Sequence, residues 1–516
     1  MRWTSLLLLT ALVVVACSGT SAPDTTGVAT AAGVATAAGV ATTAAPVPTP
    51  EAPPPSTTSI PTAALGAGAR GIGDEYFPTL GNPGYDVTHY LLDLRFEPVT
   101  GELDATVTIE ATATDRLETL NVDLAGFVIT DVQVDGSPAD HERVRQDVVV
   151  SPTMPLASGE TFTVDLAYEG VPRPAPSSAV GFGIGWVSSE TGGSYVVAEP
   201  DAAHTWFPSN DHPSDKATFE FRITVPQGTT AAANGTLVET IEGDGEATWV
   251  WQMDEPMTTY LATVVIGAFD IVTDEAASTD AGVPIRHVLP AGTTLEDYPG
   301  LERQGEMLSF LADLFGPYPF DVYGIAIVDG FDAALENQTL SLFDGDVVTS
   351  GFFDVFLVHE LAHQWFGDSV SLQRWEDIWL NEGFASYAEW LWIEREAGSE
   401  VVRAAITEER LQFTELGLPP PGNPPRNDLF NASVYRVGAM ALHALRLTVG
   451  DDAFFDILRT YTARFAGATA TTEDFVAVAE EVSGEELDEL FEGWLYGDLI
   501  PELPQPEVAP IPGPAD

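Results

Sequence analysis

The chain has 516 residues, of which 78 are acidic and 20 are basic, so its formal net charge is −58. A surface this acidic repels phosphate, which excludes a nucleic-acid partner and disfavours docking on anionic lipid headgroups. Hydrophobic residues make up 45% of the chain, enough for the cores of two or three domains, and the single cysteine excludes an intramolecular disulfide.

The chain begins with a segment typical of exported proteins. Arg2 is followed by an apolar run over residues 6–16, which is shorter than the roughly 20 residues that span a bilayer. The run ends in Val14-Val15-Ala16-Cys17, which resembles a bacterial lipobox. The resemblance implies that 1–17 is a lipoprotein signal peptide and that a lipid on Cys17 anchors the protein to the outer face of the bacterial cell membrane. The alternative is an ordinary signal peptide with a chance cysteine.

Two further segments have compositions that do not favour a packed core. Residues 18–72 are mainly Ala, Thr, Gly, Pro and Ser, with almost no large apolar side chain. Such a segment cannot bury enough surface to offset the entropy lost on ordering, so we expect a disordered tether. Residues 501–516 are rich in proline, and we expect a loose tail there.

Residues 73–272 carry the pattern of an all-β domain. Short segments alternate between apolar and polar residues, for example over 90–96, 161–168 and 219–225. Turn signals such as Asp135-Gly136 and Asn234-Gly235 separate them. This spacing predicts a β domain of about 200 residues.

Residues 273–500 have helical periodicity. An amphipathic helix is predicted over 301–315 and ends at Gly316-Pro317, and a buried strand follows over 322–328. Longer helices are predicted over 353–366 and 375–395.

The helix predicted over 353–366 contains a candidate metal site. His359 and His363 are four residues apart, so both imidazoles lie on one helix face and can bind one ion. Glu360 lies between them, where it can take a proton from water at the metal. The alternative is a pair of histidines that only pack against neighbouring side chains.

A catalytic zinc ion needs a third protein ligand and one open position. Glu382 follows His363 by 19 residues on the helix predicted over 375–395, a spacing that allows a return helix to aim its carboxylate at the same ion. Two histidines, one carboxylate and one open position make a hydrolytic zinc centre with one Zn²⁺ per chain.

Six segments in order along the chain resemble the aminopeptidase N family of gluzincin zinc metallopeptidases. These are EPDA from Glu199, FPSNDHP from Phe207, AALEN from Ala333, HELAHQWFGD from His359 with WLNEGFASY from Trp379, and YRVGA from Tyr435. The resemblance implies an α+β multidomain fold, in which an all-β saddle-like domain precedes a thermolysin-like, mainly helical catalytic domain. It also implies a zinc aminopeptidase that hydrolyses the N-terminal bond of peptides.

The resemblance also implies a role for each matched residue. His359, His363 and Glu382 would bind zinc, and Glu360 would be the general base. Tyr435 would donate a hydrogen bond to the tetrahedral oxyanion. Glu336, Glu199 and Asn337 would bind the free N-terminus of the substrate.

The sequence also departs from the family pattern. Ala333 and Leu335 replace the usual Gly and Met, and Val197 stands where a glutamine is frequent, which reshapes the pocket for the first side chain. Because the chain ends just after the catalytic domain, we expect a short form without the C-terminal domains of longer relatives. Two alternatives stay open, a thermolysin-type endopeptidase and a non-catalytic surface lipoprotein that binds a ligand or partner.

Overall fold

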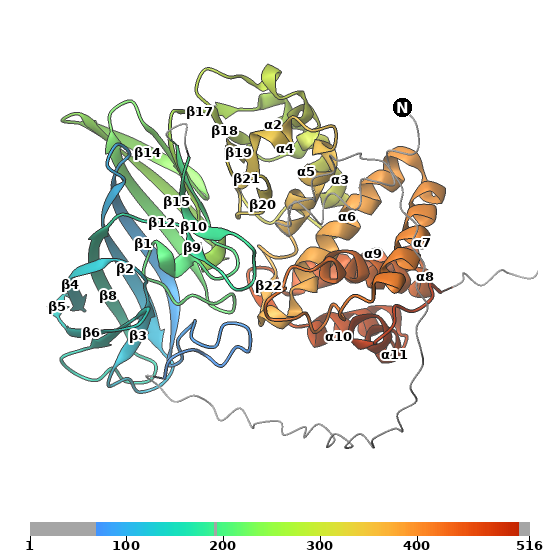
Figure 1. Cartoon of the computed structure of the whole chain (residues 1–516), viewed down its shortest axis with the longest axis horizontal. Coiled ribbons are helices and arrows are strands. Elements are labelled where there is room, and N and C mark those ends of the chain that lie inside the picture. Colours follow the sequence, from blue (N-terminus) through green and yellow to red (C-terminus); the bar gives the residue numbers. More distant parts are fainter. Residues whose placement is uncertain (1–68, 190–192, 505–516) are drawn as a thin grey trace, which may run out of the picture.

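The structure is a computed structural model that describes residues 69–189 and 193–504. The predicted signal peptide with Cys17, nearly all of the tether and most of the tail lie outside the described residues. A β-rich part and a mainly helical part lie side by side (Figure 1). The predicted fold class is confirmed, because an all-β part precedes a part that combines a sheet with helices.

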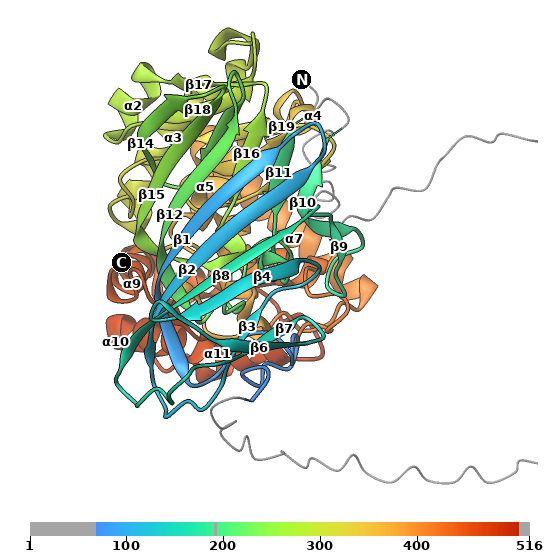
Figure 2. The same cartoon turned by 90° about the vertical axis from the view of Figure 1, so that its left-hand side faces the viewer.

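An eight-stranded sheet forms the outer wall of the β-rich part (Figure 2). Its central strands β1 and β12 are parallel to each other, and the remaining pairs are antiparallel. Alternate residues are buried along the strands, as the period-two sequence pattern predicts. In spatial order the strands are β14 (Thr236–Gly243), β15 (Glu246–Thr258), β12 (Lys216–Pro226), β1 (Tyr85–Glu97), β2 (Glu102–Ala113), β8 (Thr161–Gly170), β4 (Val128–Val134) and β5 (Ser137–Pro138).

Two smaller sheets complete this part. One has the order β13 (Thr230–Ala233), β16 (Val264–Gly267), β11 (Ser194–Val197), β10 (Gly183–Ser188) and β9 (Ala175–Pro176); the other has β3 (Leu120–Asp123), β7 (Asp147–Ser151) and β6 (Asp140–Val144). The predicted turn at Asp135-Gly136 is a hairpin turn between β4 and β5, in which both residues have positive φ. Asn234-Gly235 instead joins β13 to β14, which belong to different sheets.

The second part begins with a five-stranded sheet. Its order is β17 (Phe269–Thr273), β18 (Arg286–Pro290), β19 (Ile325–Val328), β21 (Ser341–Asp344) and β20 (Ala334–Leu335). The domain boundary predicted at residue 272 falls inside β17, which pairs with β18 of this sheet. Strand β19 is fully buried and corresponds to the strand predicted over 322–328.

Helices form most of the remaining chain. They are α2 (Glu275–Ala281), α3 (Gln304–Phe315), α4 (Gly345–Val348), α5 (Phe353–His363), α6 (Trp379–Ala397), α7 (Ser399–Leu416), α8 (Gly438–Val449), α9 (Asp451–Arg464), α10 (Thr472–Ser483) and α11 (Asp488–Phe491). Short strands β22 (Ser371–Leu372) and β23 (Thr469–Ala470) pair beside them. Within the described ranges, none of the helices is long and apolar enough to cross a membrane.

The helix predicted over 353–366 ends three residues early, at His363. The chain turns there, since the amide of Gly367 donates to the carbonyl of Val370, and Gly367 has a φ of 126°. Helix α6 begins four residues later than predicted, after a short 3₁₀ turn over Trp375–Asp377.

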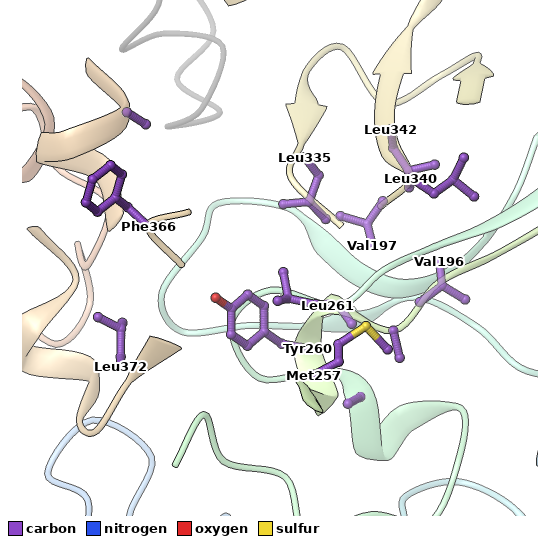
Figure 3. Packing of buried hydrophobic residues seen from close by; sticks show 14 of the residues in the cluster. Val196, Val197, Met257, Tyr260, Leu261, Leu335, Leu340, Leu342, Phe366 and Leu372 are labelled. Carbon is purple, nitrogen blue, oxygen red and sulfur yellow. The ribbon is translucent and has the colours of Figure 1, made fainter. Parts of the chain in front are cut away.

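Apolar side chains from both parts share one continuous core. At the junction, Val197 of β11 and Leu335 of β20 line one cavity, and Leu261 is buried in the same core (Figure 3). The only lysine of the chain, Lys216 of β12, crosses the same junction. Its ammonium donates to the carbonyls of Asp368 and Ser369 at 2.7 and 2.9 Å, in the loop that follows α5. The β-rich part therefore contacts the segment beside the predicted metal helix directly.

Candidate metal centre

The two histidines of the predicted metal site lie on helix α5, which is buried along nearly its whole length. Their ring centroids are 4.8 Å apart. The Nδ1 atom of His359 lies 2.8 Å from Oε1 of Glu389, and Nδ1 of His363 lies 3.1 Å from the carbonyl of Phe366. Because both partners are acceptors, each Nδ1 donates, and in the neutral form of each ring the lone pair lies on Nε2.

Glu382 of helix α6 completes the group. Its Oε2 atom lies 3.4 Å from Nε2 of His359 and 3.6 Å from Nε2 of His363, and the three ligand atoms lie within 4.8 Å of one another. Two neutral imidazoles and one carboxylate form the donor set of a hydrolytic zinc site. The lone pairs and the carboxylate oxygen face one point, so the residues fit a zinc ion.

Glu360 is buried beside this group. Burial raises the pKa of Glu360 to about 8, an effect that His359 opposes and that the negative charge of Glu382 reinforces. A divalent cation at the three ligands would stabilise the ionised carboxylate and lower this pKa. The ionised form is the one that a general base requires.

Glu336 and Glu199 form a second acidic group in the same cavity. Burial raises the pKa of both carboxyls, and the charge of Glu336 raises that of Glu199 further. Among the described residues, one oxygen of each side chain is buried without a hydrogen-bond partner. Two buried carboxylates with free acceptors suit a cation with several donors, such as a primary ammonium group.

Glu336 lies a short distance from Glu360 and His363, and hydrogen bonds of Gln364 fix this distance. One ligand atom from each of Glu336, Glu360 and His363 lies within 4.8 Å of the other two. Gln364, one residue after α5, donates from its Nε2 to the carbonyl of Glu336 at 3.0 Å and accepts from the amide of Thr339 at 2.9 Å. The segment that carries Glu336 is therefore tied to the end of the metal helix.

Tyr435 lies in a π-helical turn, Ser433–Val437, that leads into α8. Its ring stacks on His359 at a centroid distance of 6.1 Å, and its hydroxyl donates to Glu382. A phenol at this place can donate to an oxygen atom held beside the metal.

Apolar side chains form the rest of the cavity wall. They come from both parts of the fold and include Val180, Phe182, Val197, Phe331, Leu335 and Phe430. Val197 and Leu335, two of the departures from the family pattern, both line the cavity. The sequence did not single out the three phenylalanines, because they come from segments without a motif.

Asn337 directly follows Glu336, and its side chain is fully buried. Its predicted place among the residues that bind the substrate's N-terminus stays a prediction. Its Nδ2 donates to the carbonyl of Leu261 in the β-rich part at 2.9 Å. This contact holds the two parts together behind Glu336.

The chain matches two family models, and together these cover both parts of the fold. The Peptidase M1 N-terminal domain matches residues 86–261, and the Peptidase family M1 domain matches residues 300–494. Aminopeptidase M1-A of Oryza sativa subsp. japonica is 33% identical over 318 residues, which are 57% of this chain and 36% of that protein. Aminopeptidase N of Streptomyces lividans is 27% identical over 409 residues, 72% of this chain and 46% of that protein. The chain thus spans less than half the length of these curated relatives.

Solved structures match over their whole length. The M1 zinc metallopeptidase from Deinococcus radiodurans is 35% identical, with a TM-score of 0.79, over 86% of this chain and 100% of that chain. A glutamate-to-alanine variant of the same enzyme was solved with a Tyr-Ser-Ala substrate, with a TM-score of 0.77, 35% identity and coverage of 85% and 100%.

The first prediction concerns the metal. We expect the purified protein to hold one zinc ion per chain, and His363→Ala to lose it, because the two remaining ligands cannot close the site. Elemental analysis after gel filtration measures the zinc content. His443→Gln is the matched control, since His443 is a largely buried histidine of α8 that faces Tyr387 instead of the metal group. Zinc at wild-type stoichiometry in His363→Ala would rule out this ligand set.

Proposed function

The chain belongs to peptidase family M1, and we propose that it is a zinc aminopeptidase that removes single residues from the free N-terminus of peptides. The observation that carries the proposal is the pair Glu336 and Glu199, which shares one cavity with the metal group. Several relatives are named aminopeptidases, which supports the same activity. A bound zinc ion supplies a Lewis acid that polarises water and the scissile carbonyl.

The residues of this chain divide the reaction between them. Glu360 accepts a proton from the attacking water and then passes it to the leaving amine. Tyr435 donates a hydrogen bond to the oxygen that becomes negatively charged in the tetrahedral transition state.

Glu336 and Glu199 hold the substrate's α-ammonium group and fix the register of cleavage. Glu336 lies close to Glu360 and His363, and this short distance supports cleavage after the first residue of the peptide. The apolar wall at Val197, Phe331 and Phe430 favours an apolar first side chain.

The second prediction tests the general base. Glu360→Gln keeps the shape of the side chain but cannot accept a proton, so we expect kcat to fall by about 10²–10⁴-fold. Zinc content and KM for a leucyl reporter should stay near wild-type values, because the side chain at this position is neither one of the three zinc ligands nor part of the ammonium site. Normal turnover in this variant would contradict the mechanism.

The third prediction separates an aminopeptidase from an endopeptidase. Losing a buried charge partner costs roughly 2–5 kcal/mol, so we expect Glu336→Gln to lower kcat/KM for a leucyl reporter by about two to three orders of magnitude. Glu199→Gln should act in the same direction. The wild-type protein should not cleave the N-acetylated peptide that corresponds to a good substrate. An endopeptidase would cleave it, and would do so equally well in both variants.

We also propose that the protein is exported and held at the outer face of the cell membrane by a lipid on Cys17. The support is the apolar run over 6–16 that ends in a lipobox-like sequence, together with the absence of any other cysteine in the sequence. Cys17 itself lies outside the described residues.

The fourth prediction tests this anchor. In a bacterial host, the wild-type chain should sediment with membranes and incorporate labelled palmitate, whereas Cys17→Ser should do neither, because no other thiol can carry the lipid. Ser18→Ala is the control, since it changes the neighbouring residue and leaves the thiol in place. Equal sedimentation of all three proteins without label would overturn the proposal.

A further inference from the structure

A row of buried charged side chains leads from the metal site into the helical part. Glu389 of α6 accepts from Nδ1 of His359 on one oxygen, and its other oxygen accepts from Arg436 at 2.9 Å. The same guanidinium donates to both oxygens of Glu409 on α7, at 3.1 Å each. Arg436 has no exposed surface, and its guanidinium lies 4.7 Å from the ring centroid of Trp390.

A contribution to the stability of the fold does not by itself explain why these buried charged side chains are present. Replacing a buried ion-pair network with apolar side chains of similar volume is often neutral or stabilising, because removing charges from water costs several kcal/mol per ion. The arrangement does restrict geometry, since a planar guanidinium with fixed donors holds Glu389 and Glu409 in one orientation. A fixed Glu389 in turn fixes the plane and tautomer of the His359 imidazole.

Arg436 also occupies a special place in the backbone. It directly follows Tyr435 within the π-helical turn Ser433–Val437, a conformation that is rare and frequent at functional sites. Neighbouring side chains in a helical turn point in different directions. Tyr435 therefore faces His359 while Arg436 faces Glu389 and Glu409, and both arrangements depend on the same turn.

We propose that Arg436 is a positioning residue that sets two parts of the catalytic site at once, the imidazole of His359 through Glu389 and the phenol of Tyr435 through the shared turn. The proposal rests on the proposed function for the role of Tyr435, whereas its metal-binding part does not depend on peptidase activity. Zinc affinity and the position of the Tyr435 phenol therefore both depend on the buried guanidinium of Arg436.

The fifth prediction tests this role with Arg436→Lys. Lysine keeps the positive charge but lacks the planar fork, so it cannot hold Glu389 and Glu409 together. We expect the Kd for zinc, measured by competition with a chromogenic chelator, to rise about 10–100-fold, as is common when the support of a metal ligand is removed. At saturating zinc, kcat for a leucyl reporter should fall while KM stays nearly constant, because the ammonium site is untouched.

Two further variants keep the test decisive if Arg436→Lys folds poorly. Glu409→Gln removes one charge at the far end of the row, and we expect a smaller loss of zinc affinity and kcat in the same direction. Arg446→Lys is the matched control: Arg446 of α8 pairs with Glu394 of α6 and with Asp451, and no metal ligand is among its pairing partners. It should lower the melting temperature and leave the zinc Kd unchanged.

The outcomes distinguish the effect of Arg436 on zinc binding from its effect on Tyr435. If Arg436→Lys and Glu409→Gln lower the melting temperature as Arg446→Lys does, with zinc Kd and kcat within about twofold of wild type, the row is only structural and the proposal is wrong. A higher Kd for zinc with unchanged kcat would overturn the part of the proposal that concerns Tyr435. A weaker zinc Kd in a chain that cleaves no aminoacyl reporter would support the metal-binding part while the proposed function fails.

Discussion

The dominant physical constraint in this structure is the burial of several carboxylates in one cavity. Glu199, Glu336, Glu360 and Glu382 are all buried, and each lies near at least one other negative charge. Like charges in a region of low dielectric are costly unless a cation lies between them. These carboxylates therefore need cations beside them. Glu382 needs a metal ion and, under the proposed function, Glu336 and Glu199 need the ammonium group of the substrate. The same requirement extends to Glu389, which pairs with Arg436.

This arrangement needs both parts of the fold to be fixed relative to each other. Glu199 follows strand β11 of the β-rich part, whereas Glu336 and the metal ligands belong to the other part. A shift of about 1 Å between them would change the distance from the ammonium group to the scissile bond, an error that can cost two orders of magnitude in rate. The hydrogen bonds from Lys216 to the loop after α5 and from Asn337 to Leu261 cross between the two parts and oppose such a shift.

The sequence could predict those parts of the site that follow from local spacing. His359 and His363 share a helix face at any helix length, so the early end of α5 did not affect their placement. Helix α6 also begins later than predicted, yet Glu382 is still part of it and lies in its first turn. The contacts of Arg436 with Glu389 and of Asn337 with Leu261 could not be predicted in this way. Their partners are tens of residues away in the chain or in the other part of the fold, and no periodic pattern encodes those contacts.

The surface charges behind the net charge of −58 act over longer distances than the buried carboxylates of the cavity do. At physiological ionic strength the Debye length is about 8 Å, so most surface carboxylates are screened from a peptide inside the site. They raise the local concentration of cationic peptides and the rate of encounter, an effect that weakens with added salt. Under the proposed function, retention of the substrate depends on Glu336 and Glu199, whose burial shields them from that screening. Salt should therefore act mainly on the association rate, while the discrimination between free and blocked N-termini, which rests on two buried side chains, persists.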